Sequence, residues 1–235
     1  MNKTVLITGS SRGIGLALAK QYQSDGWNVI GAARNPSTAE KVGLSADVEA
    51  VQFVQLDTSD EDSIIRAAKD LEGEAIGVLI NNAGIADLQE TFESMTKESM
   101  IKQFEVNAVG PFLVTRAFVP HLKAAVTKSG SAKLAQITTS LASIALHDGT
   151  IPYPGYRMSK AALNMAHMNI THELKSDKII CATICPGYVA TDMTNYVPGT
   201  LQPSESAAAV SKVIAGLTPD DTGVFFNHVG DRVSW

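Results

Sequence analysis

Two side chains in the second half of the chain are suited to moving a proton. Tyr156 and Lys160 are four positions apart, so in a helix they lie on the same face. A free phenol has a pKa of about 10, and using it near neutral pH requires stabilising the phenolate by about 3–4 kcal/mol. A neighbouring ammonium provides stabilisation of that kind. The spacing therefore predicts an acid–base pair with Tyr156 as the proton carrier.

Near the N-terminus, glycines are spaced G-xxx-G-x-G in the run Thr8-Gly9-Ser10-Ser11-Arg12-Gly13-Ile14-Gly15. The run follows an apolar segment and opens an amphipathic one. Glycines in such a strand-to-helix turn let the backbone approach a pyrophosphate at the helix N-terminus. We predict a dinucleotide site here, although the same glycines could form an ordinary turn and their spacing is not the more familiar G-x-G-xx-G.

The end of the second predicted strand indicates which nicotinamide cofactor is preferred. A carboxylate there would bind ribose hydroxyls, whereas a cation accommodates a 2′-phosphate. The strand ends in Ala33-Arg34 without a carboxylate, and Arg34 together with Arg12 could hold the phosphate. We therefore expect NADPH rather than NADH, unless both arginines are simply solvated.

Polar residues follow the third and fourth predicted strands. Asp57 could reach the adenine amino group or could cap the next helix, which begins near Thr58-Ser59-Asp60. Residues 81–84, Asn-Asn-Ala-Gly, supply amides and small side chains beside the cofactor.

The elements that position these residues alternate between short apolar segments and longer amphipathic ones. This alternation predicts a single α/β domain over residues 1–235, a doubly wound Rossmann fold with a mostly parallel seven-stranded sheet and helices on both faces. Residues 96–126 are long for one helix, and Gly110-Pro111 should kink or divide them. Residues 188–204 read as a loop over the carboxyl edge of the sheet, where ligands bind in such folds. The expected strands span residues 4–8, 28–33, 51–55, 76–81, 133–139, 179–184 and 223–227.

Composition excludes several classes of function. The formal net charge of −5, without long blocks of one sign, gives no footprint for nucleic acid or an anionic membrane, and no segment reads as a membrane span or a cleaved leader. We expect a cytoplasmic protein. Cys181 and Cys185 lie in an apolar strand and read as two buried thiols, not as a metal or redox site. None of the histidines has ligand spacing, and no metal is expected.

Taken together, these motifs resemble the short-chain dehydrogenase/reductase family over essentially the whole chain. The glycine run, Asn-Asn-Ala-Gly, Tyr156xxxLys160 and Pro186-Gly187 with Thr191 occur in the family's order. The segment from Tyr156 to Asn164 and the C-terminal segment from Gly223 are similar, more narrowly, to sniffer-type and C-factor-like carbonyl reductases.

The resemblance implies a role for each matching residue. Tyr156 would protonate a carbonyl oxygen as hydride arrives from NADPH, and Ser140 would hydrogen-bond that oxygen. Lys160 would bind the nicotinamide ribose and, with the oxidised nicotinamide ring, lower the pKa of Tyr156. Asn107 would link Lys160 to solvent through a water, and a homodimer or homotetramer would be expected. The implied contacts to NADPH or NADP+ are Gly9, Ser11, Arg12, Gly13, Ile14, Gly15, Arg34, Asp57, Thr58, Asn82, Ala83, Gly84, Tyr156, Lys160, Pro186, Gly187, Val189 and Thr191.

The identity of the serine is the first departure from the family pattern. The family commonly places its serine thirteen positions before its tyrosine, which would select Ser143, whereas Ser140 is sixteen positions before Tyr156. We favour Ser140 because it closes the predicted strand and because residues 146–154 can absorb three extra residues in a loop.

A second departure is Tyr153, which has Arg157 four positions later and so mimics the motif. Pro154 and Gly155 disfavour a helix through that pair, so Tyr153 is expected to line the substrate pocket instead. A largely apolar, aromatic pocket would suit a small hydrophobic or aromatic carbonyl. The residues expected to line it are Leu141, Ile144, Tyr153, Tyr188, Met193 and Tyr196.

Two other functions use the same residues. A cofactor-sensing or signalling protein would keep the fold for binding, although such proteins usually lose part of the Tyr/Lys/Ser set. An alcohol dehydrogenase would run the same chemistry in the oxidative direction. The sequence favours a carbonyl reductase acting on a small aldehyde, ketone or dicarbonyl.

Overall fold

The fold was obtained as a computed structural model that describes residues 3–39 and 51–235. Its strands form one seven-stranded sheet in the order β3-β2-β1-β4-β5-β6-β7, and every neighbouring pair is parallel. All seven predicted strands are present, with ends that differ from the prediction by at most two residues. They are β1 (Thr4–Thr8), β2 (Asn28–Ala33), β3 (Gln52–Gln55), β4 (Val78–Asn81), β5 (Ala132–Ile137), β6 (Ile179–Cys185) and β7 (Val224–Asn227).

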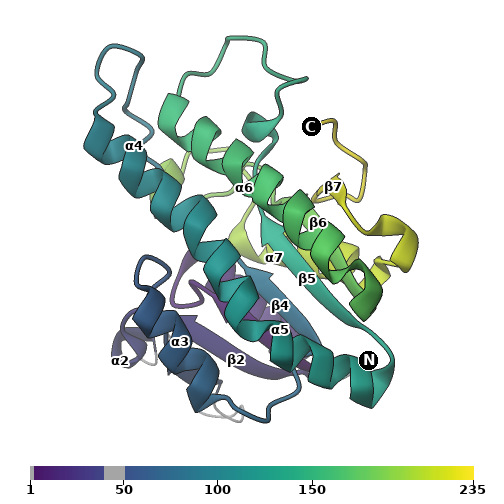
Figure 1. The fold of residues 1–235 in the computed structure, drawn as a ribbon. Helices are drawn as coiled ribbons and strands as arrows, with labels where there is room; N and C mark the ends of the chain where they lie inside the picture. Colours follow the sequence, from purple (N-terminus) through teal and green to yellow (C-terminus); the bar gives the residue numbers. More distant parts are fainter. Residues whose placement is uncertain (1–2, 40–50) are drawn as a thin grey trace.

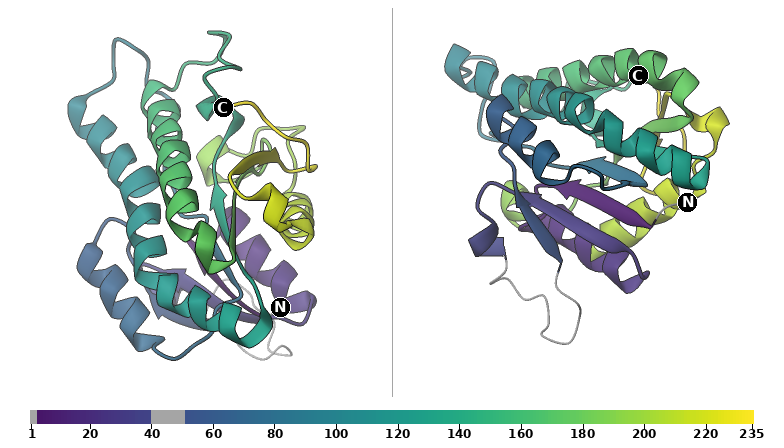
Figure 2. Two further views of the ribbon diagram at one scale, coloured as in Figure 1. Left: turned by 45° about the vertical axis from the view of Figure 1, so that its right-hand side comes forward. Right: turned by 60° about the horizontal axis from the view of Figure 1, so that its bottom comes forward.

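Helices cover both faces of this sheet, which confirms the doubly wound α/β prediction (Figures 1 and 2). On one face, Phe118 and Ile170 pack with Leu79 of the sheet, and on the other Leu18 and Val210 do so around Ile7. The first face carries α3 (Glu61–Asp70), α5 (Gly110–Ser129) and α6 (Pro154–Leu174); the second carries α1 (Gly13–Ser24) and α7 (Pro203–Gly216). The short α2 (Pro36–Ala39) follows β2, and α4 (Lys97–Phe104) leads into α5.

Local sequence signals explain where several helices begin and end. The Asp60 carboxylate accepts hydrogen bonds from the backbone N–H groups of Asp62 and Ser63 at the start of α3. Prolines open α6 and α7 in the first turn, where no backbone donor is needed. Gly130, in the left-handed conformation, ends α5.

The predicted break in the stretch 96–126 is confirmed. A π-helical turn, Glu105–Val109, separates α4 from α5, and α5 begins at Gly110. Such turns insert an extra residue and are frequent at functional sites. Asn107 lies inside this turn and is fully buried.

Cys181 and Cys185 both lie on β6, are buried and carry free thiols, as predicted. Burial raises the pKa of the Cys181 thiol to about 12, which keeps it protonated and unreactive at neutral pH. Among the helices that the structure describes, none combines the length and apolar character that crossing a bilayer requires.

Candidate active site

The site begins where the strand order reverses, between β1 and β4. Here hydrogen bonds join the start of the glycine turn after β1 to residues 81–84, which follow β4. The Thr8 hydroxyl accepts hydrogen bonds from the backbone N–H groups of Asn82 and Ala83 at 3.0 and 3.1 Å, and the Asn82 amide donates to the Thr8 carbonyl at 3.0 Å. A crevice at this reversal point is where dinucleotides bind in the fold.

Two glycines make this close approach possible. Gly9 has φ +66°, and a Cβ built on it would lie 2.9 Å from the Cα of Ala83. A Cβ on Gly15 would lie 2.2 Å from the Gly9 carbonyl oxygen and 2.5 Å from the Asn82 amide nitrogen. A side chain tolerates none of these three distances, so the loop requires glycine at both positions.

The start of α1 also leaves donors for an anion. Its N-cap, Arg12, makes no side-chain capping bond, and no acidic residue lies in the first turn. The first backbone N–H groups of a helix point outwards without intrahelical partners and attract negative charge. The glycine cradle and this uncapped helix end together fit a pyrophosphate.

Arg12 and Arg34 are both exposed, but Arg12 has a partner that the sequence did not predict. Its Nη1 lies 3.2 Å from Asp192 Oδ2 in the 188–204 loop, and the Tyr196 hydroxyl donates to Asp192 Oδ1 at 2.8 Å. Because the Arg12 and Asp192 side chains are exposed, this ion pair contributes little to stability. It links the glycine turn to the loop across the crevice.

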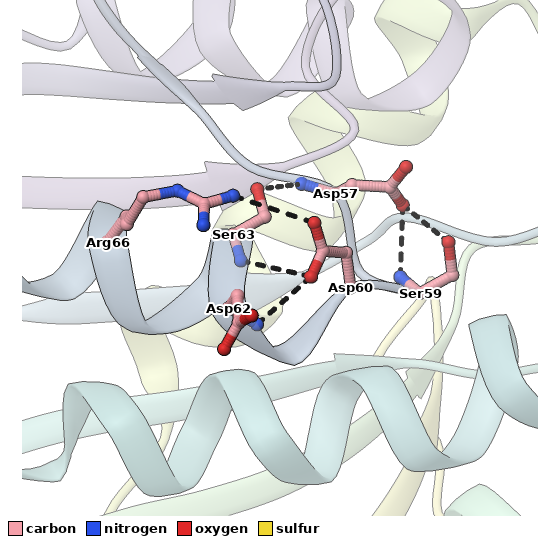
Figure 3. A network of polar contacts seen from close by, with 6 residues as sticks. All are labelled: Asp57, Ser59, Asp60, Asp62, Ser63 and Arg66. Carbon is pink, nitrogen blue, oxygen red and sulfur yellow. Dashed lines mark hydrogen bonds and ion pairs between the residues drawn. The ribbon is translucent and has the colours of Figure 1, made fainter.

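Asp57 does not cap the following helix, which corrects one of the two interpretations from the sequence. Asp57 Oδ1 instead accepts from the Ser59 N–H at 3.0 Å and the Ser59 hydroxyl at 2.7 Å, closing a local turn (Figure 3). The cap is Asp60, which also pairs with Arg66 at 3.5 Å. The adjacent Thr58 is buried, and its carbonyl oxygen lies close beneath Gly110.

Tyr156 and Lys160 lie one turn apart on α6, at the carboxyl end of β5. Lys160 is buried, and its Nζ donates a hydrogen bond to the Ile137 carbonyl at 2.8 Å. Burial lowers the pKa of Lys160 to about 8. Burial also raises the pKa of the half-buried Tyr156, Cys185 adds to that rise, and a hydrogen bond with Thr139 opposes it.

In the chain itself the Tyr156 pKa is raised, whereas the lowering implied by the resemblance depends on Lys160 together with the oxidised nicotinamide ring. Burial dominates because it disfavours the charged phenolate, and the Lys160 ammonium is turned to a backbone carbonyl. Tyr156 is thus protonated at neutral pH, the form that a proton donor needs.

Asn107 is fixed beside Lys160 by the π-helical turn. Its amide donates to the Ile85 carbonyl at 2.8 Å and to the Ser159 hydroxyl at 2.9 Å, and its Oδ1 accepts from the Ile85 N–H at 2.8 Å. A Cβ built on Gly84 would lie 3.1 Å from Asn107 Oδ1 and 3.4 Å from Lys160 Nζ. The structure thus brings Asn107, Gly84 and Lys160 together at the end of β4.

Three hydroxyls follow β5, and the structure places them differently. Ser140 opens a 3₁₀ turn, Ser140–Ala142, and is exposed. Ser143 is buried, and its hydroxyl accepts from the Leu146 N–H at 3.1 Å. Thr139 is the residue whose side chain hydrogen-bonds with Tyr156, a contact that sequence reasoning missed.

Arg157 was also missed as a positioning residue. Its buried guanidinium donates to the carbonyls of Ile151, Pro152 and Leu141 at 3.0, 2.9 and 3.0 Å. These bonds tie the 3₁₀ turn and the 144–152 segment to α6. Tyr153, with φ +53°, is the N-cap of α6 and lies outside the helix, as Pro154 indicated.

Of the residues expected to line a substrate pocket, only some lie near Tyr156. Leu141 and Tyr153 are half-buried beside the Tyr156 region, whereas Tyr188, Met193 and Tyr196 are exposed on the 188–204 loop. Ile144 is also exposed.

The last two residues of the predicted 188–204 loop belong to α7, which begins at Pro203. Hydrogen bonds between residues 188–190 and Leu201 hold the base of the loop together. The Leu201 N–H donates to the Tyr188 carbonyl, and the Ala190 N–H donates to the Leu201 carbonyl. Val189 pairs with Leu201 in an isolated parallel bridge. Just before the loop, the carbonyl of Pro186 accepts from Ser206 at 2.7 Å, and Gly187 has φ +86°.

A hollow of about 520 Å³ lies between α1, α7 and the loop. Gly13, Thr191 and Tyr196 contribute to its lining, but Tyr156 does not. The hollow therefore touches the end of the glycine turn at Gly13, and neither Tyr156 nor Lys160 lines it.

Comparisons with known proteins agree with this geometry. Residues 3–201 match the short chain dehydrogenase family. The C-signal of Myxococcus xanthus is 35% identical over 160 residues, which cover 68% of this chain and 93% of that protein.

Two solved structures align along the whole fold. An NADPH-bound carbonyl reductase from chicken fatty liver aligns with a TM-score of 0.90 and 30% identity over 99% of both chains. The carbonyl reductase Sniffer of Drosophila melanogaster aligns with a TM-score of 0.89 and 27% identity over 100% of both chains. The match to the family, the parallel sheet and the order of the motifs lead to one conclusion: this chain is a member of the short-chain dehydrogenase/reductase family of oxidoreductases.

Proposed function

We propose that this chain is an NADPH-dependent carbonyl reductase in which Tyr156 donates the proton. The observation that carries the proposal is the position of a half-buried, protonated phenol one helical turn from Lys160, at the same sheet edge as the glycine cradle. When bound, NADPH supplies the hydride. The chain must bind it, orient the carbonyl and deliver one proton.

Each polar side chain around Tyr156 would have its own role in the reduction. As the carbonyl carbon accepts hydride, its oxygen gains negative charge and takes the proton from the Tyr156 hydroxyl, which yields an alcohol and NADP+. A hydroxyl from the Thr139–Ser140 turn would hydrogen-bond the oxygen. Lys160 would hold the ribose hydroxyls, and Asn107 would connect Lys160 to solvent through a water.

The cofactor end supports NADPH over NADH. Arg34 follows β2, where NADH enzymes of this fold place a carboxylate, and Arg12 lies at the uncapped start of α1. The Arg12 side chain would exchange Asp192 for the 2′-phosphate, because a doubly charged phosphate is the stronger partner. The NADPH-bound reductase with the same fold supports this assignment.

The substrate would be a small hydrophobic or aromatic aldehyde, ketone or dicarbonyl. Leu141 and Tyr153 are half-buried near Tyr156, and the further candidates Tyr188, Met193 and Tyr196 are exposed on the loop after β6. Alcohol oxidation would use the same residues in reverse.

A second candidate is a cofactor-binding signalling protein, favoured by the similarity to the C-signal of Myxococcus xanthus. Consumption of NADPH with a carbonyl distinguishes the two, since a sensor binds the cofactor without turning it over.

The test of the proposed chemistry is Tyr156→Phe. The substitution removes the donated proton and keeps the ring, so kcat should fall by about 10²–10⁴-fold. NADPH affinity, measured by fluorescence titration, should change little. Full activity in this variant would refute Tyr156 as the proton donor. Tyr22→Phe is a matched control, because Tyr22 is buried on α1 away from the site.

A further inference from the structure

We infer that Asp192 weakens the binding of NADPH relative to NADH, because it competes with the 2′-phosphate of NADPH for Arg12. The inference rests on the proposed function and deepens it by naming a residue that sets the cofactor preference. It starts from the ion pair between Arg12 Nη1 and Asp192 Oδ2, which are 3.2 Å apart. NADH and NADPH differ only in the 2′-phosphate, so a group that acts on this phosphate changes the preference between them.

The loop side of the ion pair is held in one geometry. Asp192 opens a short 3₁₀ turn, in which the N-cap Thr191 and the third residue, Thr194, form a reciprocal capping box. The Tyr196 hydroxyl donates to Asp192 Oδ1 at 2.8 Å, while Oδ2 contacts Arg12. Because the turn and the tyrosine already fix the carboxylate, little further ordering is needed when it binds a guanidinium.

The order of the strands places Asp192 and the expected 2′-phosphate on opposite sides of Arg12. Arg12 follows β1, Arg34 follows β2, and the loop that carries Asp192 follows β6. In the sheet, β2 lies on one side of β1 and β6 lies on the other. A 2′-phosphate shared with Arg34 would lie on the β2 side. The phosphate therefore has to draw the Arg12 side chain away from the loop.

The size of this competition is limited by solvent. The Arg12 side chain is 70% exposed and the Asp192 side chain 57%, and an ion pair as exposed as this one changes an equilibrium by at most about fivefold. The Asp192 carboxylate also repels the phosphate directly, because both carry negative charge. Both effects weaken NADPH binding, and neither acts on NADH.

The experiment measures the dissociation constants of NADPH and NADH for Asp192→Asn by isothermal titration. Asparagine keeps the shape of the side chain and an oxygen that accepts the Tyr196 hydrogen bond, so only the charge is removed. At low ionic strength NADPH affinity should rise by about two- to fivefold, and NADH affinity should not change. An unchanged ratio of the two constants would overturn the inference. Weaker NADPH binding would also overturn it, because Asp192 would then orient Arg12 for the phosphate.

A double-mutant cycle tests whether Asp192 acts through Arg12. In an Arg12→Gln background, Asp192→Asn should leave the ratio of the two constants nearly unchanged, because the group for which the carboxylate competes is gone. The same gain in both backgrounds would contradict competition for Arg12.

Asp177→Asn is the matched control for the loss of one negative charge. Asp177 pairs with Lys123 at 2.9 Å and lies just before β6, at the opposite edge of the sheet from the glycine turn. This substitution should not move the ratio. An equal gain in Asp177→Asn would assign the effect to net charge and overturn the inference.

Stability and turnover separate the remaining outcomes. A fall in Tm of Asp192→Asn with an unchanged ratio would mean that Asp192 only stabilises its loop. A wild-type chain that binds neither cofactor would refute the proposed function and this inference together. NADPH binding without turnover would refute the reductase chemistry alone, because the ratio of dissociation constants still decides the role of Asp192. Turnover in wild type with an unchanged ratio in Asp192→Asn would refute the inference alone.

Discussion

The glycine turn after β1 and the Tyr156 region after β5 hold their functional groups in different ways. The turn is built from backbone, and its charged side chains, Arg12 and Arg34, are exposed. The Tyr156 region is built from buried side chains whose polar atoms bond to backbone carbonyls, as Lys160 does to Ile137. Substitutions that add side-chain volume should therefore do most harm at the glycine turn. Substitutions that remove hydrogen bonds should do most harm in the Tyr156 region.

Adding one methyl group at the glycine turn should give the largest effect on NADPH affinity. Gly15→Ala forces a Cβ against the Gly9 carbonyl, 2.2 Å away, where backbone must move. Overpacking of this kind costs about 1–3 kcal/mol, and the shifted cradle should weaken NADPH binding by more than about tenfold. Isothermal titration with NADPH measures the loss. Gly216→Ala is the control, because nothing lies within 4 Å of its added methyl; equal affinities would contradict the cradle.

Removing the Arg157 guanidinium, at the proton-transfer end, should give the largest effect on stability. Arg157→Met keeps the stem but leaves three carbonyls without their donor. Hydrogen bonds to charged groups contribute about 1.5–3 kcal/mol each, not additively, so the free energy of unfolding should fall by about 2–4 kcal/mol. Denaturant unfolding tests this, and kcat should fall more than NADPH affinity. Arg116→Met, at an exposed ion pair with Glu61, should change neither quantity appreciably.

The buried His167 on the inner face of α6 predicts a loss of stability in acid. Burial lowers its pKa from 6.5 to about 4. The unfolded chain therefore binds a proton on this histidine below pH 6.5, whereas the folded chain binds it only below about pH 4. The free energy of unfolding consequently falls as the pH is lowered from 6.5 to 4. Between pH 7 and pH 5 this one group should remove about 2 kcal/mol of the free energy of unfolding.

A replacement without a titrating ring isolates this contribution. His167→Gln should flatten the pH dependence between pH 7 and pH 5, whereas His172→Gln, on the exposed side of the same helix, should leave it unchanged. An identical acid slope in wild type and His167→Gln would show that other groups cause the loss.

The smallest effect is expected at Arg34, because its side chain is exposed. Arg34→Gln removes one charged contact to a 2′-phosphate and should weaken NADPH relative to NADH by about tenfold, or about 1.4 kcal/mol. Arg66→Gln, equally exposed but on α3, serves as the control. The ratio of kcat/KM values for the two cofactors is the measurement, and an unchanged ratio would mean that Arg34 does not contact the cofactor.

Local patterns were sufficient to predict much of the fold and part of the site. The sheet follows from short apolar segments between amphipathic ones, and the glycine turn follows from its spacing after β1. That Tyr156 and Lys160 share one face of a helix follows from their four-residue spacing, and the break near Gly110 follows from the adjacent proline. Each of these signals lies within a few residues of the feature that it predicts.

Features that depend on distant contacts or on a one-residue register were not predictable. Arg12 and Asp192 are 180 positions apart, so their ion pair depends on how the 188–204 loop folds back. The contact between the Thr139 and Tyr156 side chains depends on where β5 ends and which way the next side chain points. The cap of α3 is Asp60 because the turn around Asp57 places the helix start three residues later than expected.

The central claim, that this chain reduces carbonyls with NADPH, has one direct test. NADPH carrying deuterium at the transferred position is mixed with a panel of small aldehydes, ketones and dicarbonyls, and both nicotinamide absorbance and the products are followed. We expect NADPH consumption with at least one hydrophobic or aromatic carbonyl, and one deuterium on the carbinol carbon of an alcohol formed in equal amount. Tight NADPH binding with no turnover across the whole panel would contradict it.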